Sequence, residues 1–341
     1  MNLSKNTVPE PLFEVRTLKK DDMQGYAECM DSVWGQTYPN KIAYHPEQYM
    51  NAIENGRYYS VGSFSKDGEF AGHTSLWEWV NIPGVYELGM CAVKEKFRHN
   101  SMQERMVSAC IEEAKKDNKK TALYTEAICD HPYSQKTFYK CGLRPCGFTL
   151  NHYPPDVLVS SFSDPKAYTS LCMLTLPLKK TRKTVYVPKE LKCILEDIYK
   201  DCGYDRELLI DRTDSATGKS SSMITYSELL KSAGIIYYDL GSGSIKEFEN
   251  YQKEIAEHGA DVVHMHISLK APGIADMYDA AKKSGFFFCG IIPDTEFGDM
   301  LYMEKMVNCE VEFDEIICSN ETGPLLEIIK RFAGEAGCIH T

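Results

Sequence analysis

The sequence predicts an α/β fold with two tandem domains, each a mixed, mostly antiparallel, twisted sheet flanked by helices. The chain has 341 residues, enough for about two domains at roughly 150 residues each. Strand and helix patterns alternate along its length. The order of hairpin strands, long helix, strand, helix and two further strands occurs twice. We expect a polar leader at 1–11, a first domain at 12–179 and a second at 180–341.

The elements of the first domain follow from hydrophobic periodicity and turn residues. Met102, Met106, Cys110 and Ala114 recur at helical spacing, and Gly68 supplies the positive φ of a hairpin turn. The predicted elements are strands at 13–18, 57–65, 69–80, 85–93, 122–126, 143–151 and 168–178, and helices at 21–33, 102–117 and 134–140.

The second domain is predicted in the same way. The basic run Lys179-Lys180-Thr181-Arg182-Lys183 is interpreted as a solvated linker, and Pro188 starts the first helix after it. The predicted elements are strands at 184–187, 206–211, 222–227, 234–240, 261–268, 286–292 and 299–306, and helices at 188–201, 245–258, 274–284 and around 327–333.

Composition excludes several classes of protein. The net charge of -11 argues against nucleic-acid binding, because phosphates require a basic face. Residues 1–160 carry 18 basic and 20 acidic groups, which leaves 20 and 29 for the rest. No apolar run is long enough to span a membrane, and the N-terminus has no apolar signal core. Thirteen cysteines without a C-x-x-C pair indicate cytosolic thiols. We therefore expect a cytoplasmic protein.

The stretch Glu87–Met102 is the most informative part of the chain. It is predicted as a strand, a short loop holding Arg98, and a helix. A helix N-terminus offers unpaired N–H groups and a partial positive charge, which suit a diphosphate. A strand that stops pairing near Cys91-Ala92-Val93 would leave backbone groups free for an amide-containing arm. Together these features suit coenzyme A.

Over about residues 12–178 the sequence resembles the GNAT superfamily of acyl-CoA-dependent N-acyltransferases. The resemblance rests on the strand–loop–helix unit around Arg98, on His131-Pro132-Tyr133-Ser134-Gln135 and on Phe138-Tyr139-Lys140-Cys141-Gly142-Leu143. It implies acetyl-CoA as cosubstrate and a small-molecule or protein amine as acceptor. The cofactor-binding residues it implies are Cys91, Ala92, Val93, Arg98, His99, Asn100, Ser101 and Met102.

The second half is similar to a bacterial group in which a degenerate GNAT-like domain follows a GNAT domain. The similar segments are Thr184-Val185-Tyr186-Val187-Pro188 and 284–293. In that group the pair is often attached to an ATP-binding kinase-like module. The resemblance therefore implies two tandem GNAT-type domains, with a kinase-like protein or a second copy of the chain as expected partners.

The cofactor loop departs from the family pattern. The family usually has Arg or Gln followed by x-x-Gly-x-Gly or Ala, whereas this chain reads Arg98-His99-Asn100-Ser101-Met102-Gln103. Both glycines are missing. Ser101 is small and can cap the helix, and Asn100 tolerates left-handed geometry better than most residues.

Transfer to an amine needs a base for the ammonium and an acid for the leaving thiolate. By resemblance Glu87 is the expected base and Tyr139 the expected acid. Glu126, His131 and His73 are further candidates.

Other chemistry stays open. Cys129 with His131 could form a nucleophilic pair, and His264 with His266 could bind a metal from one strand face. The loop 239–245 could form an anion nest with Ser244 as helix cap. The alternative function is a non-catalytic tandem scaffold that senses a ligand or docks a partner.

Overall fold

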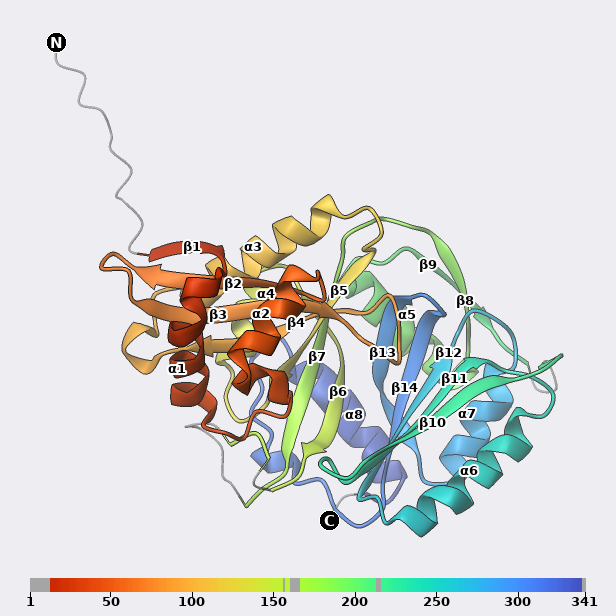
Figure 1. Ribbon diagram of the computed structural model, residues 1–341. Coiled ribbons are helices and arrows are strands. Elements are labelled where there is room, and N and C mark those ends of the chain that lie inside the picture. Colours follow the sequence, from red (N-terminus) through yellow and green to blue (C-terminus); the bar gives the residue numbers. More distant parts are fainter. Residues whose placement is uncertain (1–12, 156, 160–165, 213–215, 339–341) are drawn as a thin grey trace.

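The computed structural model describes residues 13–155, 157–159, 166–212 and 216–338. The predicted leader at 1–11 lies outside these residues. Twelve strands form one twisted sheet in the order β1-β2-β3-β4-β5-β7-β6-β13-β14-β12-β11-β10 (Figure 1). Strands β8 and β9 form a separate parallel pair.

The elements of the first half are β1 (Phe13–Thr17), α1 (Met23–Trp34), α2 (Pro46–Glu54), β2 (Tyr58–Ser65), β3 (Phe70–Glu78), β4 (Tyr86–Val93), α3 (Met102–Lys116), β5 (Ala122–Ile128), α4 (Tyr133–Lys140), β6 (Arg144–Tyr153) and β7 (Thr169–Pro177). Those of the second half are β8 (Lys183–Val187), α5 (Lys192–Cys202), β9 (Arg206–Ile210), β10 (Ser221–Ser227), β11 (Ser232–Asp239), α6 (Ser244–His258), β12 (Val262–Ser268), α7 (Ile274–Lys283), β13 (Phe287–Thr295), β14 (Gly298–Met306) and α8 (Gly323–Glu335).

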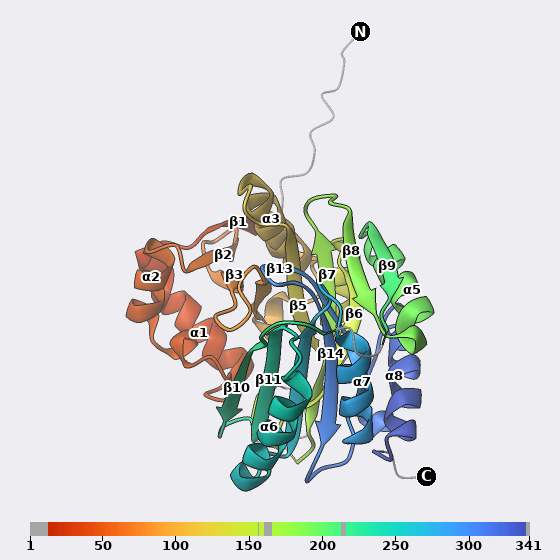
Figure 2. The ribbon, with the colours of Figure 1, turned by 90° about the vertical axis from the view of Figure 1, so that its right-hand side faces the viewer.

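Helices cover both faces of the first half of the sheet. Apolar residues of α1 and α2 form one buried cluster, which includes Tyr26, Met30 and Tyr49. Residues of α3 and α4, such as Met106 and Phe138, pack in the main core on the other face. Figure 2 shows α1 and α2 set apart from α3 across the strands. This packing of helices on both faces of the sheet fixes the start of α3 near the C-terminal end of β4.

The second half repeats the connectivity of the first. Strands β4 and β5 are parallel and flank α3 in sequence, and β11 and β12 are parallel and flank α6. The antiparallel pairs β5–β7 and β7–β6 correspond to β12–β14 and β14–β13. The predicted repetition of elements is present, but the predicted pair of separate sheets is wrong, since one sheet runs through both halves.

The two halves of the sheet meet at a pair of glycines. Gly147 of β6 pairs with Gly290 of β13. A Cβ atom on Gly290, whose φ is +146°, would lie 2.4 Å from the Cα atom of Gly147. Only glycine allows this close backbone approach.

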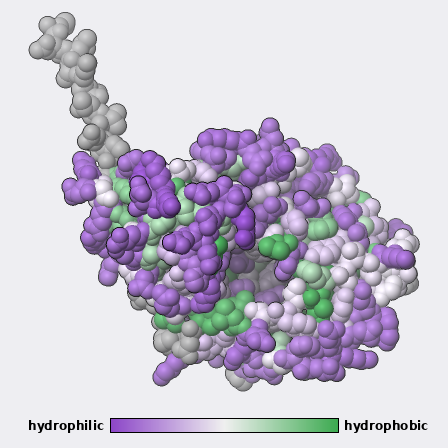
Figure 3. Space-filling model, viewed as in Figure 1, coloured by the Kyte–Doolittle hydropathy of each residue, from purple (hydrophilic) through white to green (hydrophobic). Residues whose placement is uncertain are grey.

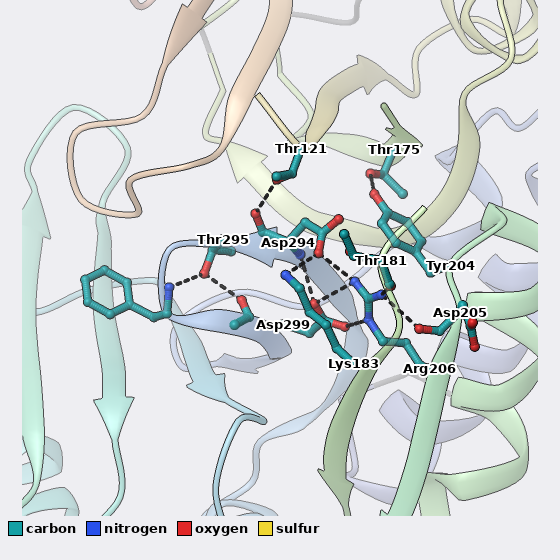
Figure 4. A network of polar contacts seen from close by, with 12 residues as sticks. Thr121, Thr175, Thr181, Lys183, Tyr204, Asp205, Arg206, Asp294, Thr295 and Asp299 are labelled. Carbon is teal, nitrogen blue, oxygen red and sulfur yellow. Dashed lines mark hydrogen bonds and ion pairs between the residues drawn. The ribbon is translucent and has the colours of Figure 1, made fainter. Parts of the chain in front are cut away.

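A buried ion network lies in the second half, beside the first half (Figure 4). The Arg206 guanidinium contacts Asp299 at 2.6 Å and Asp294 at 2.7 Å, and all three side chains are at most 1% exposed. Lys183 adds a second cation at 2.5 Å from Asp294. Thr121 of the first half donates to the Asp294 carbonyl. Lys183, predicted to lie in the solvated linker, is thus part of the folded structure.

Two helices differ from the sequence prediction. Helix α2 was not predicted, although Pro46 occupies a first-turn position where its missing N–H costs nothing. Helix α8 is longer than predicted and buries five residues: Leu325, Leu326, Ile329, Phe332 and Ala333. In the described part of the chain, none of the helices has the length and apolarity needed to cross a bilayer.

Candidate active site

A first cavity of about 670 Å³ lies where β4 and β5 separate. The two strands pair only at Tyr86 with Leu123 and at Glu87 with Tyr124, although both continue for several residues. The Thr125 hydroxyl donates to the Leu88 carbonyl at 2.6 Å, just beyond the last pair. The sequence predicted an opening near Cys91, and the structure opens the strands earlier.

A bulge in β4 forms one wall of this cavity. Met90, at φ 49°, and Cys91 lie together opposite Thr74, where the β3–β4 register shifts. The His73 ring contacts the Met90 carbonyl at 2.8 Å, and Trp34 donates to the Cys91 carbonyl at 3.2 Å. Both carbonyls are therefore engaged within the protein, which corrects the expectation that backbone groups near Cys91 are free.

Burial keeps His73 neutral, and its hydrogen bond to the Met90 carbonyl holds the bulge in place. Burial lowers the pKa of His73 to about 4. Its Nδ1–H donates to the Met90 carbonyl, so Nε2 accepts a hydrogen bond from the Tyr49 hydroxyl at 3.1 Å. His73 thus has a structural role in β4, and this geometry does not support the alternative that it acts as a base.

The loop before α3 has left-handed geometry without glycine. His99 has φ 68° and Ser101 has φ 51°. The Asn100 side chain donates to the carbonyls of Phe97 and Arg98, at 3.3 and 3.2 Å. The expected cap is wrong, since the Ser101 side chain makes no cap hydrogen bond to α3. The first-turn N–H groups of the helix have no intrahelical acceptor, and residues Ser101–Glu104 line the cavity.

Most predicted cofactor-binding residues meet at this cavity. Seven of the eight line it, namely Cys91, Val93, Arg98, His99, Asn100, Ser101 and Met102. The Nε atom of Arg98 donates to the Val93 carbonyl at 3.2 Å. Ala92 is not among the lining residues, because strand alternation places its side chain in the cluster under α1 and α2.

The carboxyl groups of Glu87 and Glu126 lie at the inner end of the first cavity. Trp79 donates to Glu87 at 2.6 Å, and Tyr124 donates to Glu126 at 3.2 Å. Burial, together with the Glu126 carboxylate, raises the pKa of Glu87 well above its usual range. Burial raises the pKa of Glu126 to about 7. Both carboxyl groups are therefore harder to ionise than a carboxyl group in water.

The structure does not bring Tyr139 to the cavity. The Arg144 guanidinium lies over its ring, 4.1 Å from the centroid. The preceding helical residue, Phe138, lines the cavity instead. Successive residues of a helix point about 100° apart, so the two positions face different surroundings. The sequence predicted a hydroxyl group at position 139, but the cavity is lined at the neighbouring position by Phe138, which has no hydroxyl group.

The remaining candidates are distributed over both halves. His131 lines the first cavity, but burial raises the pKa of the neighbouring Cys129 thiol well above its ordinary value, which disfavours a thiolate pair. His264 and His266 share one face of β12, as predicted. Among the described residues, no three His, Cys, Asp or Glu side chains are arranged to hold a metal ion.

A second, central cavity of about 1240 Å³ lies between the two halves. Figure 3 shows a hollow near the middle of this face, with apolar residues at its rim. The first half contributes Trp77, Trp79 and Tyr124, and the second contributes His264 and Tyr302. Glu87 and Glu126 line both cavities and so mark where the two adjoin.

In the second half, the position equivalent to the gap between β4 and β5 is closed. Strands β11 and β12 pair over six positions, from Ser232 to Tyr237, without the early separation of β4 and β5. A Cβ atom on Gly241 would lie 2.5 Å from the backbone of Lys219 and Ser220. The Ser244 hydroxyl accepts from the Gly241 N–H within the loop and does not cap α6. The predicted anion nest is therefore filled by the chain itself.

Comparison with known proteins gives one family match. Residues 24–143 match the model of the acetyltransferase (GNAT) family. No curated protein matches the chain. Solved structures similar to this chain include an N-acetyltransferase from Staphylococcus aureus Mu50, with 17% identity, a TM-score of 0.39 and coverage of 49% of this chain and 99% of that one.

Two further solved structures contain the cofactor. Spermidine N-acetyltransferase from Vibrio cholerae, in complex with CoA and spermine, has 11% identity, a TM-score of 0.39 and coverage of 50% of this chain and 97% of its own. A phosphinothricin acetyltransferase from Sinorhizobium meliloti with AcCoA has 12% identity, a TM-score of 0.40 and coverage of 49% and 88%. The model of the acetyltransferase (GNAT) family thus matches about a third of this chain, residues 24–143.

Proposed function

We propose that the protein is an acyl-CoA-dependent N-acyltransferase that transfers an acetyl group from acetyl-CoA to a primary amine of a small molecule or protein. The observation that carries this proposal is the first cavity. There, the separated strands β4 and β5, the start of α3 and Arg98 border one space. That combination accepts a diphosphate at one end and an extended arm along the strands.

The chemistry follows from the two ends of this cavity. The diphosphate binds to the first-turn N–H groups of α3 and to the Arg98 guanidinium. The thioester then lies toward Glu87 and Glu126, at the junction with the central cavity. Glu87, which the resemblance implies as base, and Glu126 are both candidates for that role, because both carboxyl groups line the junction of the two cavities.

The proposal includes the organisation of the chain. We assign residues 12–179 to the acyltransferase domain and 180–341 to a degenerate GNAT-like half. Support comes from the repeated connectivity and from the closed gap between β11 and β12. A homodimer, a kinase-like partner and a cytoplasmic location stay predictions.

Calorimetric titration of acetyl-CoA into the purified chain tests the proposal. Arg98→Ala should weaken binding by about tenfold or more, since it removes a charge-assisted contact to the diphosphate. Arg331→Ala, on α8 and outside both cavities, is the matched control and should bind normally. Absence of binding by the wild-type chain would refute the acyltransferase.

A second candidate is a non-catalytic scaffold that binds the cofactor as a signal. Phe138 at the cavity favours it, since phenylalanine cannot protonate a thiolate. Release of CoA thiol in the presence of an amine distinguishes the two functions. Binding without release would favour the scaffold.

A further inference from the structure

His264 of the second half is held in one orientation by its neighbours on β14. Its Nδ1 lies 3.0 Å from Glu304 Oε1 and 2.8 Å from the Tyr302 hydroxyl. Tyr302 donates its own proton to Glu304 at 2.5 Å, so its oxygen is left to accept. Both neighbours of Nδ1 are therefore acceptors, and Nδ1 carries the proton. The lone pair of neutral His264 is on Nε2.

Glu304 is suited to hold that imidazole. Its side chain is fully buried, and it accepts hydrogen bonds from the Leu150 N–H at 2.9 Å and the Cys289 thiol at 3.4 Å. With Tyr302 and His264, this makes four donors around one carboxyl group. A buried carboxylate facing only donors stabilises positive charge on a neighbouring imidazole.

The Nε2 atom of His264 is buried, although the residue lines the central cavity. This atom has no hydrogen-bond partner among the described residues. His264 lines the central cavity together with Glu126, and its charge would favour the Glu126 carboxylate. Thr149 bonds to Glu126 at 3.4 Å and contacts Tyr302, so polar groups run continuously from one half to the other.

We propose that the central cavity is the acceptor-amine site of this acyltransferase, and that His264, positioned by Glu304 and Tyr302, takes the first proton from the acceptor's ammonium group. The inference rests on the proposed function. It assigns the second half a direct part in the reaction, through one residue that contacts the substrate and two that position it.

The proton steps balance without a tyrosine acid. The ammonium N–H bond breaks toward Nε2 of His264, which leaves a neutral amine and an imidazolium held by Glu304. The amine lone pair then attacks the thioester carbonyl carbon. Glu126 removes the second proton from nitrogen as the C–S bond breaks, and gives it to the thiolate, so the products are amide and CoA thiol. His264 finally releases its proton to solvent.

The cavity lining indicates the class of amine. Aromatic side chains of Trp77, Trp79 and Tyr124 border the approach to the two carboxyl groups. Aromatic faces and carboxylates attract organic cations. We therefore infer a primary ammonium group on an extended body that packs against aromatic rings.

Steady-state acetylation by the full chain tests the inference, with spermidine, tyramine and L-lysine amide as acceptors and CoA thiol release as readout. His264→Asn should lower kcat/KM about 100-fold or more, with the calorimetric affinity for acetyl-CoA unchanged. His45→Asn is the matched control, because His45 is exposed and lines neither cavity.

A pH profile separates positioning from general damage. Glu304→Gln removes the carboxylate that stabilises the imidazolium, so the acidic limb of kcat/KM should move about 1 pH unit or more toward acid. The titratable groups that face His264 are Glu126, His152, His266, Tyr302 and Glu304. His152 and His266 stay neutral, because burial lowers the pKa of each to about 3.

The outcomes are distinct. Activity of His264→Asn within about twofold of wild type, or an unmoved acidic limb in Glu304→Gln, overturns the role of His264. A wild-type chain that binds acetyl-CoA but acetylates none of the three amines overturns the assignment of the central cavity to an amine. A wild-type chain that does not bind acetyl-CoA refutes the proposed function, and the inference with it.

Discussion

At the scale of single residues, environment separates side chains of the same type. Glu87 and Glu126 lie on neighbouring strands and border the same two cavities. Hydrogen bonds from Tyr124 and Thr149 offset part of the effect of burial on the pKa of Glu126, which is about 7. Glu87 has one such donor, Trp79, and burial raises its pKa as well. Burial and hydrogen-bond partners, and not the residue type alone, set how readily each carboxyl group gives up its proton.

The neighbours Phe138 and Tyr139 give a prediction at the same scale. Tyr139→Phe should leave acetyl-CoA affinity and CoA release within about twofold of wild type, because its ring packs against Arg144 and does not line the cavity. Calorimetry and a thiol-release assay check this, with Arg98→Ala as the variant that responds. A loss of turnover above about tenfold would return the acid role to Tyr139.

At the scale of elements, the loop between β4 and α3 adopts strained backbone dihedrals. These dihedrals keep the start of α3 in the position expected for a cofactor-binding helix. Left-handed conformations cost a non-glycine residue about 1–2 kcal/mol each. His99 and Ser101 both adopt them, and Ser101 stands where the family pattern has its first glycine. The helix start is thus preserved at some expense in stability.

Replacing Ser101 with glycine tests this strain. Ser101→Gly should raise the free energy of unfolding by about 1 kcal/mol, because glycine adopts φ 51° without steric cost. Urea denaturation measures the change. Ser108→Gly, at an exposed position inside α3, is the control and should lower stability by about 0.5 kcal/mol. Equal effects of the two substitutions would show that the loop is not strained.

At the scale of the whole molecule, the two halves form one folded unit. The sheet is continuous through Gly147 and Gly290, and Thr121 of the first half donates to the carbonyl of Asp294 in the Arg206 network. The C-terminal segment also returns to the first half, where Gln135 of α4 accepts hydrogen bonds from the Ser319 N–H and the Thr322 hydroxyl. The central cavity depends on this joint packing, since residues of both halves line it.

Removing the central cation should destabilise the whole molecule. Arg206→Met leaves Asp294 and Asp299 buried without their shared partner, so we expect a loss of about 3–5 kcal/mol in urea denaturation. Arg182→Met is the control, because Arg182 is exposed and its contact with Glu207 is 3.7 Å long. A loss below about 1 kcal/mol for Arg206→Met would show that the network contributes little.

Local signals in the sequence were sufficient for most elements and for one end of the site. Periodic apolar residues predicted α3, α6 and most strands, and the residues predicted around Arg98 line the first cavity. Helix α2 was missed, because the stretch 34–56 has no strong period and its buried face depends on contact with α1. Tyr139 lies outside the lining of the first cavity and Phe138 is part of it, because successive side chains of a helix point about 100° apart.

The sequence by itself determined the elements, their repeated order and the family resemblance of the first half, because these depend on neighbours a few residues apart. Only the tertiary structure decided that one sheet joins both halves, that Glu87 and Glu126 are buried at the junction of the two cavities, and that His264 lines the central cavity. Those properties depend on burial and on partners such as Glu304 and Thr149, which lie far from them along the chain. Desolvation and hydrogen bonding arise only when such distant segments pack together.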